Sequence, residues 1–119
     1  MAEIWPREIR LGKDRRALVV AFDNGETHVL SAEYLRTHSP SAEVQGHSPE
    51  QRKTVAGKAD VRILEVEPVG NYAVRLVFDD LHETGIFSWA YLLQLGREFE
   101  ARWAAYLEEL AEKGLSRSR

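Results

Sequence analysis

The stretch ALVVAFDNGETHVLSAEYL, residues 17–35, carries three structural signals in succession. A β-branched, apolar run at 17–22 is followed by Asn24-Gly25, a pair that adopts the positive φ angles of a tight turn. We therefore expect a β-hairpin that returns through Thr27–Leu30, with an edge strand at 8–11 beside it. Ser31 stands where a hydroxyl caps the first turn of a helix, which predicts a short helix at 32–36.

The same order of signals returns later in the chain. FDNGETHVLSAEYL at 22–35 is echoed by FDDLHETGIFSWAYL at 78–92, with one residue inserted in the turn. Strands are expected at 61–67, 72–78 and 84–87, with a turn at 68–71 and one apolar face shared by Tyr72, Val74, Leu76 and Phe78. Ser88 would cap a helix that runs to Leu95 and breaks at Gly96. The echo indicates two similar units, unless hairpin–helix units simply use similar residues.

The C-terminal region predicts one more helix. Five apolar side chains recur at helical spacing, namely Phe99, Trp103, Tyr106, Leu107 and Leu110. This pattern is typical of an amphipathic helix from about 98 to 113, followed by a frayed tail. The predicted fold class is therefore α+β, with an antiparallel or mixed sheet built from two β-hairpin–helix units and a C-terminal amphipathic helix.

Composition narrows the class of protein. The chain has 119 residues, of which 44% are apolar, so a single domain over 1–119 can bury an ordinary core. Its net charge of −3 disfavours a nucleic-acid binder. The longest apolar run, at 17–22, is too short to cross a membrane, and the first residues do not form a secretion signal. With no cysteine in the sequence, a cytoplasmic location is expected.

Residues 37–60 show neither strand nor helix periodicity, so they predict a long loop, which is often a functional feature. His38, Glu43 and His47 lie in this loop, and His82 lies in the turn of the second hairpin. Imidazole and carboxylate groups together bind zinc or ferrous iron, although an ordinary packing or surface role is the commoner one for each histidine. Phosphate-binding glycine loops, nucleophile elbows and the His-x-Asp/Glu iron motif are missing, so no catalytic residue is assigned. The three tryptophans are read as core residues or, alternatively, as the walls of a binding groove.

Three segments taken together resemble a known family. They are PREI at 6–9, YLRTHSPSAEVQGH at 34–47, and residues 67–89, which begin EPVGNYAV and end GIFSW. The chain resembles the gamma-butyrobetaine hydroxylase-like N-terminal domain, also called domain of unknown function 971, over about residues 5–110. It is most similar to the stand-alone bacterial members of this family.

The resemblance implies a zinc-site position. In oxygenase members of the family, a Cys-x-Cys-x-x-Cys cluster and a later histidine hold a structural zinc. Here the cysteine positions are Ser39, Ser41 and Val44, and only the histidine, His82, is kept. That zinc site should therefore be absent as built. The resemblance also brings the 39–44 segment near the His82 turn.

A substitute metal site is a hypothesis that follows from this arrangement. His82, His47, His38 and Glu43 would then converge as nitrogen and oxygen ligands for zinc or iron. The leading expectation for function is a small, non-catalytic module that binds a protein partner and carries a weak metal site. The alternative is a metal-binding accessory domain that serves an iron-dependent oxygenase or iron–sulfur cluster delivery. A third reading, acid–base catalysis by His47 and His82 with Glu43, is kept open.

Overall fold

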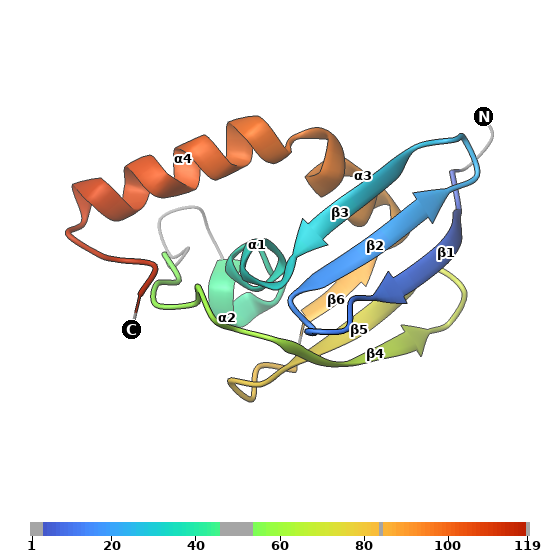
Figure 1. The fold of residues 1–119 in the computed structure, drawn as a ribbon, viewed down its shortest axis with the longest axis horizontal. Coiled ribbons are helices and arrows are strands. Elements are labelled where there is room, and N and C mark those ends of the chain that lie inside the picture. Colours follow the sequence, from blue (N-terminus) through green and yellow to red (C-terminus); the bar gives the residue numbers. More distant parts are fainter. Residues whose placement is uncertain (1–3, 46–53, 84, 119) are drawn as a thin grey trace.

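The computed structural model describes residues 4–45, 54–83 and 85–118 (Figure 1). The strands are β1 (Pro6–Leu11), β2 (Ala17–Phe22), β3 (Thr27–Ser31), β4 (Ile63–Val69), β5 (Ala73–Phe78) and β6 (Gly85–Ser88). The helices are α1 (Ala32–Thr37), α2 (Ala42–Gln45), α3 (Trp89–Arg97) and α4 (Phe99–Glu112). None of these helices is long and apolar enough to cross a membrane.

The strands form two three-stranded antiparallel sheets, ordered β1-β2-β3 and β4-β5-β6. Each sheet is one of the predicted hairpins with one further strand, and each is followed by a helix, so the α+β class and the two-unit plan are confirmed. The expected turn at 68–71 is wrong in its first half. Pro68 and Val69 continue β4 and pair with Val74 and Ala73, so the chain reverses only at residues 70–72.

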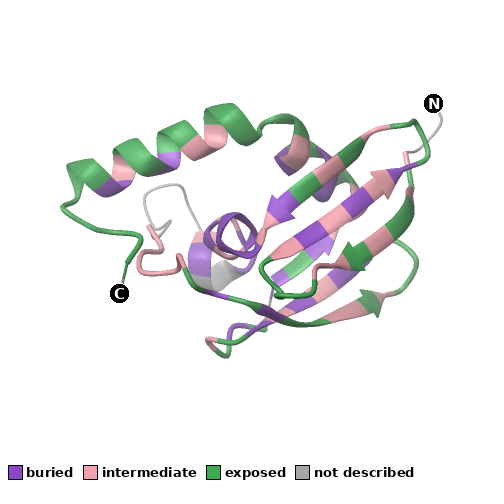
Figure 2. Cartoon of the chain, in the orientation of Figure 1, coloured by how far each residue is buried: buried purple, intermediate pink, exposed green. Residues whose placement is uncertain are grey.

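The core lies between the sheets and the helices, and it is built from alternate residues of the central strands (Figure 2). Leu18, Val20 and Phe22 of β2 are fully buried, as are Leu76 and Phe78 of β5. Their spacing of two is the period of a strand with one buried face, as predicted.

Tyr72 does not share this buried face. It precedes β5 rather than belonging to it, and 55% of its surface is exposed. The prediction that placed Tyr72 on the same face as Val74, Leu76 and Phe78 is therefore wrong.

Both predicted helix caps are confirmed. The Ser31 hydroxyl accepts a hydrogen bond from the backbone N–H of Tyr34 at 3.0 Å, and Ser88 accepts one from Tyr91 at 3.1 Å. The predicted break at Gly96 is wrong, because α3 continues through it to Arg97. A Cβ at Gly96 would lie 2.4 Å from Cγ of His28. The glycine therefore allows α3 to lie close against β3 rather than ending the helix.

The C-terminal helix is confirmed as α4, but the tail that follows it is held in place. The Arg117 guanidinium donates two hydrogen bonds to Glu33 at 2.7 and 2.8 Å. Backbone amides of Gly57 and Ala59 donate to the carbonyls of Ser116 and Arg117. Residues 115–118 thus connect α1 to the segment that precedes β4, whereas the sequence predicted a frayed end.

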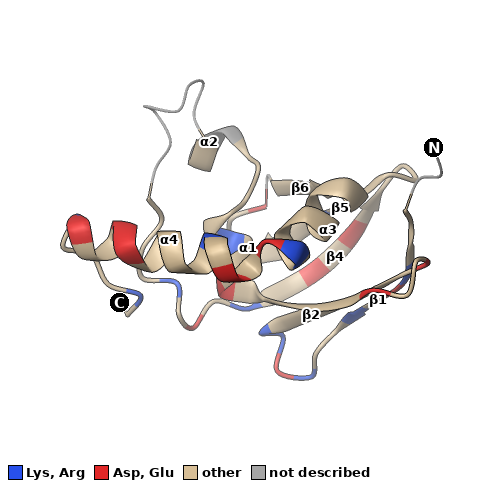
Figure 3. Cartoon of the chain, turned by 90° about the horizontal axis from the view of Figure 1, so that it is seen from above, with Lys and Arg blue, Asp and Glu red and all other residues tan. Residues whose placement is uncertain are grey.

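The predicted loop at 37–60 contains the short helix α2, which the sequence did not indicate. Basic and acidic residues are interspersed over the described elements (Figure 3).

Candidate functional site

The end of the first unit meets the turn of the second at a buried polar cluster formed by Ser39, Ser41 and His82. Nε2 of His82 lies 3.0 Å from the Ser39 hydroxyl and 3.4 Å from the Ser41 hydroxyl, and Ser39 donates to Ser41 at 3.3 Å. Only 0%, 8% and 4% of Ser39, Ser41 and His82 is exposed. The expectation that the 39–44 segment lies at the His82 turn is therefore confirmed for both serines. Val44 is also buried, at 2% exposure.

The turn that carries His82 is fixed by its own backbone and by Asp80. The amide of Phe78 donates to the carbonyl of His82, and the amide of Leu81 donates to the carbonyl of Phe78. One carboxylate oxygen of Asp80 accepts from the amide of His82 at 3.1 Å. The other pairs with Arg36 Nε at 2.8 Å and with Lys58 Nζ at 2.6 Å.

These contacts decide the ionisation of Asp80. Burial alone raises the pKa of its carboxyl, but hydrogen bonds from Lys58, the His82 amide and Arg36 outweigh that effect and lower the pKa to about 2. The charged carboxylate is therefore part of the folded structure. It joins α1, the segment before β4 and the β5–β6 turn.

Gly85 makes room for the polar cluster, and sequence reasoning did not identify it. A Cβ at this position would lie 2.6 Å from the Ser39 hydroxyl and 3.0 Å from Cε1 of Phe87. The first residue of β6 must therefore be glycine for the serine to reach His82. The only signal in the sequence was a glycine just after the turn, which has no specific meaning by itself.

Leu81 stands out at the tip of the same turn. Its side chain is 85% exposed, and its backbone has a φ of +73°. That conformation favours glycine or asparagine, and a leucine in it costs about 1 kcal/mol or more. An exposed apolar residue in a strained conformation is unusual for a turn that glycine could form without cost.

The other predicted ligands are placed as follows. Nδ1 of His38 lies 3.0 Å from the Tyr34 carbonyl and 3.1 Å from the Thr37 hydroxyl, at the C-terminal end of α1. Its ring packs against Tyr34 and Tyr106. His47 and the side chain of Glu43 lie outside the described part of the structure. Their convergence with His82 therefore stays a prediction.

The chemistry of the cluster does not fit the implied zinc site. Structural zinc takes four thiolate, imidazole or carboxylate ligands, whereas Ser39, Ser41 and His82 offer one imidazole and two neutral hydroxyls. Within residues 4–45, 54–83 and 85–118, the structure contains no group of three or more His, Asp or Glu side chains that could hold a metal ion. The Ser39–His82 pair is also buried. What the arrangement does is hold the 39–41 segment to the turn.

Fold and cluster together define a small α+β module of two sheet–helix units, joined where the end of α1 meets the β5–β6 turn. The model of the family described as gamma-butyrobetaine hydroxylase-like, N-terminal, matches residues 9–93. The chain belongs to this family, as its sequence resemblance indicated.

Solved structures agree with this assignment. Two solution NMR structures are each 43% identical to the chain, with TM-scores of 0.84 and 0.82. They cover 98% and 97% of the chain, which in turn covers 92% and 86% of them. A crystal structure of a protein of unknown function from Acidithiobacillus ferrooxidans, in the domain of unknown function 971 family, is 42% identical. Its TM-score is 0.64, and the match covers 76% of this chain and 91% of the crystallised chain. A search of curated proteins found no match.

Proposed function

We propose that this chain is an accessory module, without catalytic activity of its own, that binds a partner protein through the tip of the β5–β6 turn. The observation that carries the proposal is Leu81, a leucine 85% exposed at a φ of +73°. We call residues 79–83 the Leu81 turn.

The energetics of the turn favour a binding role. Glycine at position 81 would relieve the backbone strain, and a polar residue would interact better with water. Leucine has neither the relaxed backbone of glycine nor the favourable hydration of a polar side chain. Such a cost is typical of residues selected for contact with another molecule. Asp80 and His82 fix the backbone on both sides of Leu81. An apolar side chain on so rigid a support loses little entropy on binding, as expected of an interface anchor.

Site-specific cross-linking tests the proposal. A photoreactive amino acid is introduced at position 81 or, as the matched control, at Val29 of β3, which is 66% exposed. Both proteins are irradiated in cells of the source organism. We expect a discrete protein adduct from position 81 that position 29 does not give. Equal adducts from both positions, or none from either, would contradict the proposal.

A variant of the turn separates binding from folding. Leu81→Gly removes the side chain and relieves the positive φ, so the free energy of unfolding should stay the same or rise by up to about 1 kcal/mol. Affinity for the cross-linked partner should fall, because an anchor side chain is lost. A variant that is less stable and binds as well as the wild type would show that Leu81 serves the fold instead.

A second candidate function is metal binding in support of an iron-dependent oxygenase or of iron–sulfur delivery. What favours it is the place of the polar cluster. Ser39 and Ser41 meet His82, and in the sequence they shortly precede Glu43 and His47. Metal analysis of untagged protein tests it, with His82→Ala for comparison. About one zinc or iron per chain, lost in the variant, would support a metal site, and substoichiometric metal in both proteins would exclude one.

A further inference from the structure

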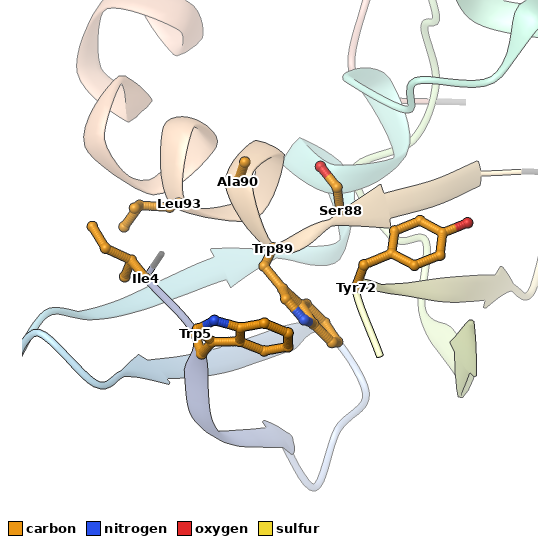
Figure 4. A pocket seen from close by; sticks show the side chains of 7 residues that line it. All are labelled: Ile4, Trp5, Tyr72, Ser88, Trp89, Ala90 and Leu93. Atoms are coloured by element: carbon orange, nitrogen blue, oxygen red, sulfur yellow. The ribbon is translucent and has the colours of Figure 1, made fainter. Parts of the chain in front are cut away.

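An aromatic groove lies at the opposite end of β5 from the Leu81 turn. Its cavity of about 390 Å³ falls within the range of ligand pockets. The lining residues are Ile4, Trp5, Tyr72, Ser88, Trp89, Ala90 and Leu93. Figure 4 shows the rings of Trp5, Trp89 and Tyr72 one after another along the groove, with Ile4 and Leu93 at the Trp5 end. We call this surface the aromatic groove.

The three aromatic residues come from distant parts of the chain, and hydrogen bonds hold the backbone of each and the ring of Trp89. Trp5 donates its amide to the Asp23 carboxylate and accepts from the Asp23 amide at its carbonyl. Trp89 donates its amide to the Tyr72 carbonyl and its indole N–H to the carbonyl of Asn71 at 2.9 Å. A groove with walls held in this way is ready to bind without a large cost in ordering.

Two side-chain donors on the groove make no hydrogen bond to any residue that the structure describes. Tyr34, Tyr91 and Tyr106 each donate their hydroxyl to a main-chain carbonyl. Tyr72 has no such bond with any residue the structure describes, and neither does the indole N–H of Trp5. Both side chains are also partly exposed, Trp5 at 37% and Tyr72 at 55%. Both donors therefore face solvent, where an acceptor of a bound molecule can replace water.

The chemistry of the walls narrows the occupant. None of the seven lining residues is charged, so an anion, or a cation that needs a carboxylate, gains no counter-charge here. A proline-rich peptide fits better. Its polyproline II backbone makes no internal hydrogen bonds and presents a free carbonyl about every 3.1 Å, while its pyrrolidine rings pack between aromatic rings.

We propose that the aromatic groove binds a proline-rich segment of a partner protein in the polyproline II conformation. Prolines pack between the rings of Trp5, Trp89 and Tyr72. The indole of Trp5 and the hydroxyl of Tyr72 donate to carbonyls of the peptide. Because polyproline II is largely formed before binding, the peptide loses little conformational freedom.

The test is a titration of ¹⁵N-labelled protein with an acetylated decaproline peptide, followed through the indole N–H signals of the three tryptophans. We expect the Trp5 signal to shift saturably. The Trp103 signal should not move, because that ring stacks on Phe99 and packs against Tyr106 outside the groove. Tyr72→Ala should raise the dissociation constant about tenfold, as for other aromatic interface anchors. Leu107→Ala, which removes a similarly exposed apolar side chain from α4, should leave it unchanged.

Four outcomes would overturn the proposal. They are no saturable shift up to millimolar peptide, an equal shift with a Gly-Ser peptide of the same length, a shift with choline but not with decaproline, and shifts that follow protein concentration alone. The last two would indicate a quaternary ammonium ligand or a second copy of the chain. Cross-linking at position 81 is independent of all four, because the Leu81 turn and the aromatic groove lie at opposite ends of β5 (Figure 1).

Discussion

The carboxylate of Asp80 is the charge on which the junction of the two units depends, and Asp80→Asn tests this directly. Asparagine keeps the size of the side chain and can still accept from the amide of His82. It removes the charge that pairs with Arg36 and Lys58 in a site where only 9% of the Asp80 side chain is exposed.

The magnitude follows from the pKa of Asp80. The pKa falls from 3.8 to about 2 in the folded protein, which corresponds to about 2 kcal/mol at neutral pH. Because the folded pKa is lowered, this stabilisation is complete above about pH 4 and is lost as pH falls through about 2. We therefore expect the free energy of unfolding of Asp80→Asn to be about 2 kcal/mol lower than that of the wild type at pH 7. The difference from the wild type should shrink between pH 4 and pH 2.

Urea unfolding followed by tryptophan fluorescence at pH 7, 4, 3 and 2.5 measures this difference. The matched control is Asp60→Asn. Its side chain is 75% exposed and lies 3.6 Å from Arg16, so it should lose less than about 1 kcal/mol. If Asp80→Asn costs no more than Asp60→Asn at pH 7, or if its cost is the same at pH 2.5, the charged junction does not stabilise the fold.

Three further outcomes are expected. Gly96→Ala should lower the free energy of unfolding by about 1–3 kcal/mol, because its methyl group would overlap a histidine ring of β3, and chemical denaturation measures the loss. Arg117→Gln should speed amide hydrogen exchange in residues 57–59 with little change in the core, since the tail loses its ion pair; unchanged exchange would show that the tail is held by other contacts. Cysteine placed together at Ser39, Ser41 and Val44 should give about one zinc per chain by metal analysis, because the first two positions lie beside a buried imidazole.

The parts of the fold that were predictable depend on local signals. Asn24-Gly25 marks a hairpin, and Ser31 and Ser88 mark helix starts through contacts three residues away. The period of two in β2 and β5 identified their buried faces. Such signals act within a few residues, so the sequence displays them directly.

Features set by distant contacts were mispredicted or missed. Gly96 looked like a helix end, but its role depends on His28, 68 positions away in the chain (96 − 28). The tail looked frayed because its anchor, Glu33, lies 84 residues before Arg117. A hydrophobic repeat in the sequence does not reveal which distant residues will be in contact. For the same reason, the division into two separate sheets could not be derived from two similar hairpins.

The candidate site was predictable only through the family resemblance. Composition gave unrelated serines and histidines, and the resemblance placed Ser39 and Ser41 beside His82, where the structure has them. It did not indicate how the space would be filled. Gly85, whose missing side chain lets Ser39 reach the ring, had no signal of its own.

The junction of the two units explains how one turn can be both strained and rigid. This chain joins the end of α1 to the β5–β6 turn with hydrogen bonds to His82 and ion pairs to Asp80. Each buried hydrogen bond contributes about 1 kcal/mol, so a few of them outweigh the cost of a positive φ at Leu81. Neutral hydroxyls also need no metal supply to hold the turn. The contacts of His82 and Asp80 therefore compensate for the strain at Leu81. Weakening them should unfold the turn locally before it unfolds either sheet.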